Sequence, residues 1–486
     1  MVMYLLLPFF FTVGGAFRPT ARVHLHRRAA MPPMRLNAAS GLAAVPAADA
    51  AAVSNDARGA WAPVASVAGL TGLGPQAVEL FGRTYAVWEH DGAWSVLDDA
   101  CPHRLAPLSQ GRVDATTGCL ECPYHGWQFD ANGACTRVPQ AERLPAARAV
   151  SLPTRVTGDL VWAFFDEAAT GEAGAAGEFP EEIYPWLVGA AERGVAFYVR
   201  ELAYSFDVLV ENFMDPAHIP FAHHGLQGAR DDGSPIAMTV LAQNATHCEA
   251  SFEDVIRGKA RKGVVSFRRP ARYHFRTLRE NGDYETNLEI FVAPVRDGRC
   301  RVFFASPLGS KVVPTWLSHA ASSRFLNTDI WLHDAERRLR SSTDGDAAYF
   351  TPSSSDLGAN LWRKWWRSSG MAASPPHAYG PANPANLDRL DRRSQIDPWK
   401  SHAAHCAPCR KALGRTRYAD ALAGALVAAA VIAPVRRVPA AALLAAGCGL
   451  RYAAGRCRAI IQGEDEPSRV ADRSVAADDN PPAPKV

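Results

Sequence analysis

The 486-residue sequence predicts an α+β chain with two folded domains and a hydrophobic helical hairpin after them. The first observation is a series of short strand-like runs between Trp61 and Phe165, separated by turn dipeptides. The second is another meander of strand-like runs at 273–304, with helical patterns after it. The third is a pair of Ala-rich apolar runs at 421–435 and 438–450. The length suits two or three domains of ordinary size.

The first 55 residues are interpreted as a targeting leader and linker. An apolar run at 1–13 is followed by Gly15-Ala16-Phe17, where signal cleavage would fall. The stretch that continues to Ser40 contains arginines and small residues and no acidic residue. This combination resembles the two-part leader of plastids bounded by extra membranes, so we expect plastid import. A plain secretory signal is the alternative.

Charge and cysteine usage argue against two classes of protein. The net charge is +3, 21% of the residues are charged, and no concentrated basic stripe indicates nucleic-acid binding. The 10 cysteines are spread over a long chain, which disfavours a secreted disulfide scaffold. Six cysteines lie outside the motifs described below and are interpreted as ordinary thiols: Cys119, Cys135, Cys248, Cys300, Cys448 and Cys457.

The first folded domain is expected over residues 56–167. Its apolar runs alternate with turn signals, which favour antiparallel hairpins. The runs are Val78–Phe81, Tyr85–Trp88 and Trp94–Leu97, and the turn signals are Gly82-Arg83, Asp91-Gly92 and Asn132-Gly133. We predict a small antiparallel β domain that closes with the strand Leu160–Phe165.

Four potential metal ligands lie in two short motifs of this domain. The motifs are Cys101-Pro-His103 and Cys122-Pro-Tyr-His125. Two thiolates on one iron and two imidazoles on the other are the ligands of a Rieske 2Fe-2S cluster. A structural zinc site is the alternative, although zinc motifs usually pair donors two to four residues apart. Pro102 alone separates the first pair, and we therefore predict a 2Fe-2S cluster at the tip of the domain.

A second iron site is indicated downstream, by His218 and His223 in the run Glu211–His223. Two histidines and one carboxylate form the facial triad of non-heme Fe(II) oxygenases, which leaves adjacent positions open for dioxygen and substrate. A mononuclear Fe(II) after a one-electron cluster indicates an oxygenase rather than a simple electron carrier.

The spacing Asp-x-x-His-x-x-x-x-His behind the cluster motif resembles that of Rieske non-heme iron oxygenases. The segments CPHRLAPLSQG, CPYHGWQFD and ENFMDPAHIPFAHHG resemble the pheophorbide a oxygenase branch most. This branch also contains chlorophyllide a oxygenase, protochlorophyllide oxygenase and a Rieske protein of the plastid inner-envelope import translocon. The likeness extends from about Trp61 to Cys409.

The resemblance also implies the third iron ligand. In the family this ligand is an aspartate far downstream, on a helix that returns to the metal, and Asp329 takes its position. Asp334 is the competitor, and an ordinary surface aspartate on an amphipathic helix is the alternative interpretation. The nearby His224 and His333 are expected to serve packing or solvent contacts.

Asp215 and Asn212 are expected beside the iron. In the family the aspartate at the position of Asp215 bonds the first iron histidine and, across a subunit boundary, a histidine of the neighbouring cluster. Such a carboxylate fixes the imidazole tautomer and is expected to conduct electrons. Its alternative role is a helix cap before Pro216. Asn212 resembles a polar position near the iron.

An Ala- and Gly-rich linker is expected at 168–180, and the mononuclear iron domain at 181–400. The turn signals Asn281-Gly282 and Asp297-Gly298 divide its meander. This pattern suits a helix-grip (START-like) fold, whose curved sheet around helices leaves a large apolar cavity.

A CxxC pair, Cys406 and Cys409, lies in the next segment, 401–413. Such a pair favours a lowered thiolate pKa and reversible disulfide formation, and a thioredoxin-responsive switch is expected. Two thiols without a redox role are the alternative, since the sequence shows no second pair of donors that would complete a zinc site.

The hydrophobic hairpin is expected over 414–456 and the disordered tail over 457–486. Each apolar run falls short of the roughly 20 residues that cross a bilayer. We favour a membrane-anchored hairpin, with two Ala-rich helices packed on protein as the alternative.

The resemblance implies a Rieske monooxygenase that acts on a chlorophyll-derived tetrapyrrole such as pheophorbide a or chlorophyllide a. It uses O2 and electrons from reduced ferredoxin or a separate reductase, because the chain has no flavin or nucleotide-binding fingerprint. A homotrimer at the plastid envelope or thylakoid is expected.

Two other functions are considered. The first is an electron carrier like the Rieske subunit of a cytochrome complex, which would need no second iron site. The second is a redox-sensing Rieske component of the plastid inner-envelope protein import machinery, which the CxxC pair and the hydrophobic tail would suit.

Overall fold

The computed structural model describes residues 59–166, 179, 187–190, 193, 195, 197–305, 313–344, 349–432 and 440–463. The predicted leader at 1–55 lies outside the described residues, as do the linker at 168–180 apart from Phe179 and the tail beyond Gly463.

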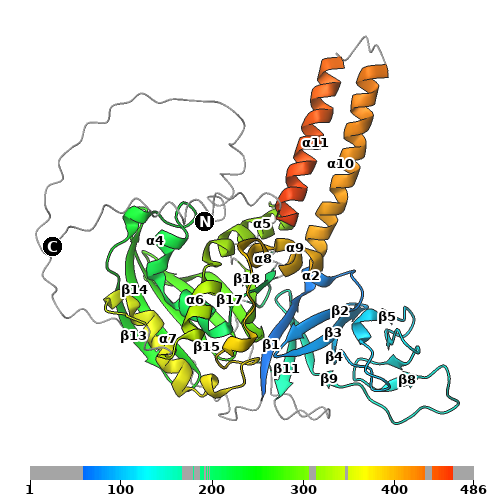
Figure 1. Cartoon of the computed structure of the whole chain (residues 1–486), viewed down its shortest axis with the longest axis horizontal. Helices are drawn as coiled ribbons and strands as arrows, with labels where there is room; N and C mark the ends of the chain where they lie inside the picture. Colours follow the sequence, from blue (N-terminus) through cyan, green and yellow to red (C-terminus); the bar gives the residue numbers. More distant parts are fainter. Residues whose placement is uncertain are drawn as a thin grey trace, which may run out of the picture. The chain divides into compact units, whose positions relative to one another are not determined.

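Three antiparallel sheets form the first domain (Figure 1). One contains β1 (Gly59–Ser66), β11 (Leu160–Asp166) and β10 (Thr154–Thr157), in that order. The second contains β2 (Gln76–Leu80), β3 (Arg83–His90), β4 (Ala93–Asp98) and β9 (Ser151–Leu152). The third contains β5 (Arg112–Val113), β6 (Leu120–Glu121), β7 (Gln128–Phe129) and β8 (Cys135–Arg137). The predicted strands of this domain and its closing strand are confirmed.

Positive-φ dipeptides form the tight turns of the second sheet. Asp91 and Gly92 have φ of 49° and 81°, and they join β3 to β4 as a two-residue loop. This backbone matches the right-handed twist of the two strands. The turn between β2 and β3 is Phe81-Gly82, with φ of 52° and 72°. It lies one residue before the predicted Gly82-Arg83, because Leu80 pairs with Arg83 and leaves only two residues for the loop.

The second domain contains a seven-stranded antiparallel sheet of order β12-β18-β17-β16-β15-β14-β13. The strands are β12 (Tyr198–Leu202), β13 (Ala237–Gln243), β14 (His247–Ile256), β15 (Lys259–Arg268), β16 (Arg272–Leu278), β17 (Tyr284–Arg296) and β18 (Arg299–Ala305). Strands β16–β18 confirm the predicted meander. Its hairpin turns contain Gly282 and Gly298, with φ of 88° and 68°.

Helices α3 (Phe206–Met214) and α7 (Leu357–Ser368) pack together on this sheet. The indoles of Trp362 and Trp365 are buried on α7, and each donates its N–H to a carbonyl, of Asp207 at 2.9 Å and Asn244 at 2.6 Å. Burying such large rings is favourable only when the polar nitrogen keeps a partner. The result is a mixed domain of strands and helices, as predicted.

The two domains share a hydrophobic core. Alternate residues of a strand point to opposite faces of its sheet. On β17, Ile290 and Val292 therefore pack against α3 and α7, while Phe291 and Ala293 pack against the β1–β11 sheet of the first domain. The face of the seven-stranded sheet that points away from α3 and α7 therefore packs against the first domain.

Four further segments of the second domain carry or orient residues of the sites below. They are α4 (Ile219–Ala222), α5 (Thr315–Leu326), α6 (Leu332–Ser341) and α9 (Pro398–Ser401). The short 3-10 turns Pro216–His218, Asn327–Asp329 and Ala403–His405 connect them to their neighbours.

The chain ends in two helices, α10 (Ala407–Ile432) and α11 (Ala440–Gln462), which lie side by side (Figure 1). Arg458 of α11 forms an ion pair with Asp420 of α10. Two predicted boundaries are wrong. Helix α10 begins inside the segment assigned to the CxxC pair, and α11 continues to Gln462, past the predicted start of the tail at 457. Over the residues that the structure describes, neither this pair nor any other helix combines the length and apolar character needed to span a bilayer.

Candidate functional site

Three predicted iron ligands meet in the second domain. His218 ends the 3-10 turn after α3, His223 follows α4, and Asp329 ends the turn after α5. The two Nε2 atoms lie 3.2 Å apart, and His223 Nε2 lies 3.4 Å from Asp329 Oδ2. Adjacent ligands at right angles around an ion with bonds of about 2.1 Å would be about 3.0 Å apart. The three donor atoms therefore suit one face of a single metal ion.

Hydrogen bonds fix both histidine tautomers. The Thr328 hydroxyl donates to the Phe325 carbonyl at 2.6 Å, so at 2.7 Å it accepts the N–H of His223 Nδ1. His218 Nδ1 likewise donates to the backbone carbonyl of Asp215. Each ring then carries its lone pair on Nε2, the atom that faces the other two donors.

Asp329 is buried, with 2% of its surface exposed. Its Oδ2 accepts an N–H of Asn212 at 3.2 Å, while its Oδ1 is buried and has no hydrogen-bond partner within the described residues. Burial raises the pKa of this carboxyl to about 6. A buried carboxylate oxygen without a partner, beside two imidazole lone pairs, fits a divalent metal. The residues therefore fit the predicted mononuclear iron.

The structure also separates ligands from neighbours. The competitor Asp334 is exposed, and its carboxylate lies 4.0 Å from Arg337. His224 is exposed and accepts the backbone N–H of Arg230, while the buried His333 contacts the Ala203 carbonyl at 2.6 Å. Asp329 itself lies in a 3-10 turn between α5 and α6 and not on an amphipathic helix.

One expectation for Asp215 is wrong. Its carboxylate does not take the Nδ1 of His218, because the backbone carbonyl of Asp215 occupies that position. The carboxylate caps the following 3-10 turn and accepts the N–H of Ala217 at 2.8 Å. The capping role, which was the alternative, is therefore present. The contact to a neighbouring subunit's cluster stays a prediction.

The two motifs of the first domain form loops with the same backbone hydrogen bonds. In each loop the cysteine carbonyl accepts the N–H four residues on, and the cysteine N–H donates to the carbonyl five residues on. The fourth residue after Cys101 is Leu105 and after Cys122 is Gly126, with φ of 59° and 70°. This left-handed backbone suits glycine best, so Leu105 adopts it against its preference.

The loops place thiols inside and imidazoles outside. Cys101 and Cys122 are buried, and burial raises the pKa of the Cys101 thiol to about 11. His103 and His125 are only partly buried and lie with ring centroids 4.7 Å apart. His103 stacks on Trp127 with centroids 4.6 Å apart. A pair of buried sulfur donors and a separate pair of imidazoles fit the two irons of the predicted cluster.

Sequence reasoning missed a third group of donors. The structure brings His319 and His402 to the two cysteines of the CxxC pair, Cys406 and Cys409, with all four side chains buried. A second pair of potential donors, which the sequence did not reveal, therefore lies beside the CxxC pair. His402 stands four residues before Cys406 and was visible in the sequence, whereas His319 is 87 residues away and gave no local signal.

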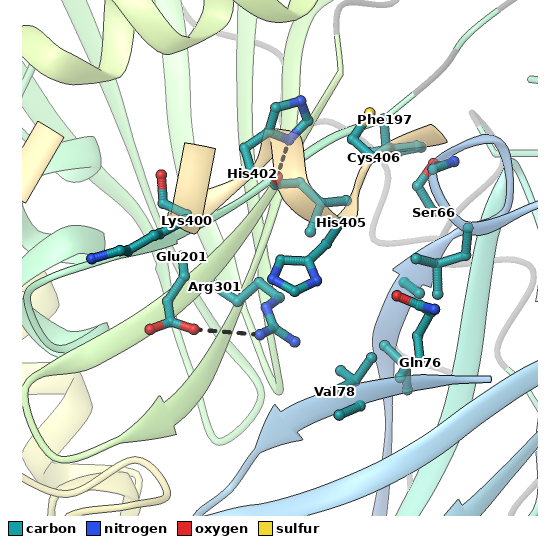
Figure 2. Close-up of a pocket in the computed structure, with 17 residues that line it drawn as sticks. Ser66, Gln76, Val78, Phe197, Glu201, Arg301, Lys400, His402, His405 and Cys406 are labelled. Carbon is teal, nitrogen blue, oxygen red and sulfur yellow. Dashed lines mark hydrogen bonds and ion pairs between the residues drawn. The ribbon is translucent and has the colours of Figure 1, made fainter. Parts of the chain in front are cut away.

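A cavity of about 110 Å³ lies beside this third group and away from the iron ligands. Figure 2 shows His402, His405 and Cys406 along it, opposite Ser66 and Gln76 of the first domain. Glu201 and Arg301, which also line the cavity, form an ion pair at 3.4 Å.

We predict that Thr328→Val weakens iron binding by about 10- to 100-fold while the fold is kept, because the hydroxyl that orients His223 is lost. The measurement is iron retained per chain against increasing chelator. Thr286→Val is the matched control, since Thr286 bonds His274 at 2.9 Å in the sheet, far along the chain from the ligands. Equal iron loss in both variants would contradict the orienting role of Thr328.

Comparison with known proteins identifies the first domain. The sequence profile of the Rieske [2Fe-2S] domain matches residues 60–148. The chain is 32% identical to pheophorbide a oxygenase, chloroplastic, of Oryza sativa subsp. japonica, over 72% of each chain. It is 29% identical to flavonoid 8-hydroxylase 2, chloroplastic, of Ocimum basilicum, over 78% of this chain and 79% of the relative.

A solved structure has the same fold. Dicamba monooxygenase bound to dicamba aligns with 65% of this chain and 98% of its own, at 20% identity and a TM-score of 0.51. That likeness concerns the arrangement of strands and helices.

Proposed function

The chain belongs to the plastid branch of the Rieske non-heme iron oxygenases, and from this premise we propose that it oxidises a chlorophyll-derived tetrapyrrole. It is an oxidoreductase that uses a 2Fe-2S cluster and a mononuclear iron. Pheophorbide a or chlorophyllide a is the proposed substrate, with O2 as oxidant and reduced ferredoxin as electron source. The observation that supports this substrate most is the 32% identity to pheophorbide a oxygenase across 72% of each chain.

When bound, the two iron centres supply one-electron transfer and dioxygen activation. The chain's own residues hold them and set their geometry. Cys101 and Cys122 are buried and would provide the two thiolates, and the partly exposed His103 and His125 would provide the two imidazoles. Overall, a monooxygenation consumes one O2, two electrons and two protons, places one oxygen atom in the product and releases the other as water.

At the mononuclear site, His218, His223 and Asp329 would hold the iron, and a triad of this kind leaves adjacent positions for dioxygen and substrate. Asn212 donates to Asp329 Oδ2 and so holds the carboxylate in place. Phe325 stacks on His223 with ring centroids 4.0 Å apart and helps to exclude water from that ligand. These contacts keep the donor set fixed while substrate binds on the open side.

We infer that the second domain holds its substrate in the apolar cavity of a helix-grip fold. The cluster of one subunit is proposed to reduce the iron of its neighbour in a homotrimer, with Asp215 at the contact. Asp215 follows α3 and precedes the 3-10 turn that ends at His218, so a contact made at Asp215 would lie next to a proposed iron ligand.

The chain is a plastid protein, like the relatives that carry the chloroplastic designation. We propose that α10 and α11 associate with a plastid membrane. The pair exposes apolar and aromatic side chains, among them Leu422, Leu444, Tyr418 and Tyr452.

The test of the function uses full-length protein with reduced ferredoxin, ¹⁸O₂ and either pheophorbide a or chlorophyllide a. The expected result is a tetrapyrrole product heavier by one ¹⁸O atom per turnover, at a rate that depends on ferredoxin. A flavonoid is the comparison substrate, because one relative is named as a flavonoid hydroxylase. Oxidation of the flavonoid alone would overturn the tetrapyrrole proposal.

The same experiment separates the import-machinery alternative. A redox-sensing component would reduce and reoxidise its cluster without oxygen entering either compound. That result would overturn the proposed oxygenase reaction.

A further inference from the structure

Two histidines and two cysteines from three separate segments meet at the base of the C-terminal helices. His319 lies on α5, His402 follows α9, Cys406 precedes α10, and Cys409 lies in the first turn of α10. All four side chains are buried, between 3% and 6% exposed, and their donor atoms all lie within 4.8 Å of one another. None of the four belongs to either iron site described above.

The distances within this group match those of a tetrahedral ion. With zinc bonds of about 2.3 Å to sulfur and about 2.0 Å to nitrogen, a tetrahedral site separates sulfur from nitrogen by about 3.5 Å. His319 Nδ1 lies 3.4 Å from Cys406 Sγ and 3.6 Å from Cys409 Sγ, and His402 Nε2 lies 3.3 Å from Cys409 Sγ. Each measured separation is within about 0.3 Å of that geometry.

A hydrogen bond orients His402 toward the sulfur atoms. His402 Nδ1 lies 2.6 Å from the Val199 carbonyl, which can only accept a proton, so Nδ1 carries the hydrogen and Nε2 the lone pair. The Tyr198 ring packs against both imidazoles, with centroids 5.4 Å from His319 and 4.4 Å from His402. A hydrogen bond from the far ring nitrogen is the usual support of a metal-bound histidine.

We propose that His319, His402, Cys406 and Cys409 form a structural zinc site, separate from the two iron centres. Two thiolates and two imidazoles in a tetrahedral arrangement are a zinc donor set. All four positions come from protein, so the site is closed and has no place for a substrate. A binuclear cluster spreads these donors over two irons, whereas four donor atoms within 4.8 Å suit one ion.

The surroundings indicate what the zinc would stabilise. Trp316, Trp399 and Ile461 pack around the two cysteines and join α5, α9 and α11 in one hydrophobic cluster. A zinc ion would connect the start of α10 to α5 and, through His402, to strand β12. Helix α5 runs directly into the turn that carries the iron ligand Asp329. The zinc site would therefore stabilise the positions of α10 and α11. It would also stabilise α5, the helix that leads to Asp329.

The cavity of about 110 Å³ beside the group provides a route for the ion. His402 and Cys406 form part of its wall, and Lys400 lies on the same side in Figure 2. A metal site needs such a path, because the ion must reach ligands that are otherwise buried.

The first experiment measures zinc by mass spectrometry and by X-ray absorption at the zinc edge, on full-length protein grown with zinc and iron. We expect about one zinc per chain with two sulfur neighbours at about 2.3 Å and two nitrogen neighbours at about 2.0 Å. The His218→Ala variant is expected to retain this zinc, which distinguishes it from zinc bound at the iron ligands.

Two variants locate the site. Cys406→Ser is expected to lower the zinc content at least about tenfold and to lower the retained mononuclear iron. Cys457→Ser is the matched control, because Cys457 packs in the same hydrophobic cluster without being one of the four donors. It is expected to keep both metals at the wild-type level.

Three results would overturn the proposal. They are a wild-type protein without zinc, zinc with nitrogen and oxygen neighbours only, and a metal-free protein with a Cys406–Cys409 disulfide. The last would favour the thioredoxin-responsive switch instead. If Cys406→Ser does not fold, the X-ray absorption of the wild type still decides the question, because it reports the sulfur neighbours directly.

Discussion

Replacing His223 by alanine is expected to remove the mononuclear iron and to lower turnover at least about 10³-fold. His223 supplies the Nε2 that lies between His218 and Asp329, so its loss leaves two donors that no longer surround one face of the metal. A metal contributes several kcal/mol to such a reaction, and each 1.4 kcal/mol is about a factor of ten in rate. The measurements are iron per chain and ferredoxin-dependent oxygen incorporation.

His224→Ala is the matched control for this change. The two histidines are adjacent, but His224 is exposed, and the hydrogen bond described for its side chain is with the backbone N–H of Arg230. We expect it to keep iron and turnover within about twofold of wild type, as exposed positions usually do. The visible spectrum of the 2Fe-2S cluster should be unchanged in both variants, because its ligands lie in the other domain. Full iron content in His223→Ala would contradict the assigned ligand.

Replacing Cys122 by serine is expected to abolish the 2Fe-2S cluster and, with it, ferredoxin-dependent turnover. Cys122 is one of the two cysteines proposed to bind the cluster, and serine does not supply the thiolate that iron requires. The measurements are the visible absorption and the electron paramagnetic resonance of the reduced protein. We expect the mononuclear iron to remain, since His218, His223 and Asp329 are untouched.

Cys135→Ser is the matched control in the same domain. Cys135 is partly exposed on β8, and its thiol contacts the Arg137 carbonyl at 3.8 Å. Its loss is expected to leave the cluster spectrum and turnover unchanged. A cluster spectrum that survived Cys122→Ser, or that disappeared in Cys135→Ser, would exclude the assignment of Cys101, His103, Cys122 and His125.

Local patterns predicted the first domain well. A dipeptide such as Asp91-Gly92 specifies its own backbone, because few residues tolerate positive φ, and the apolar runs on either side then pair as strands. The cluster ligands were equally visible, since each pair lies within one short loop whose chemistry depends on neighbours in sequence. The position of a turn is predicted less exactly, because the turn observed at Phe81-Gly82 lies one residue before the predicted Gly82-Arg83.

Within the iron site, sequence spacing and resemblance supplied the ligand identities but not their supports. His218 and His223 are five residues apart, and Asp329 was assigned by its family position. Thr328, which fixes the tautomer of His223, has no motif of its own and became visible only through its contact at 2.7 Å. Asp215 was expected to act through its carboxylate, but the short 3-10 turn brings its carbonyl to the ring instead.

The sequence by itself determined the donor types of the predicted cluster and the histidine pair of the predicted iron site, because these donors lie near one another along the chain. Only the tertiary structure decided that Asp329 and not Asp334 faces the histidines, and that His319 joins a CxxC pair 87 residues away. The physical reason is that long-range packing sets these distances. Helix α5 is held between strand β12 and the terminal helices, and no local pattern encodes which of its side chains then point inward.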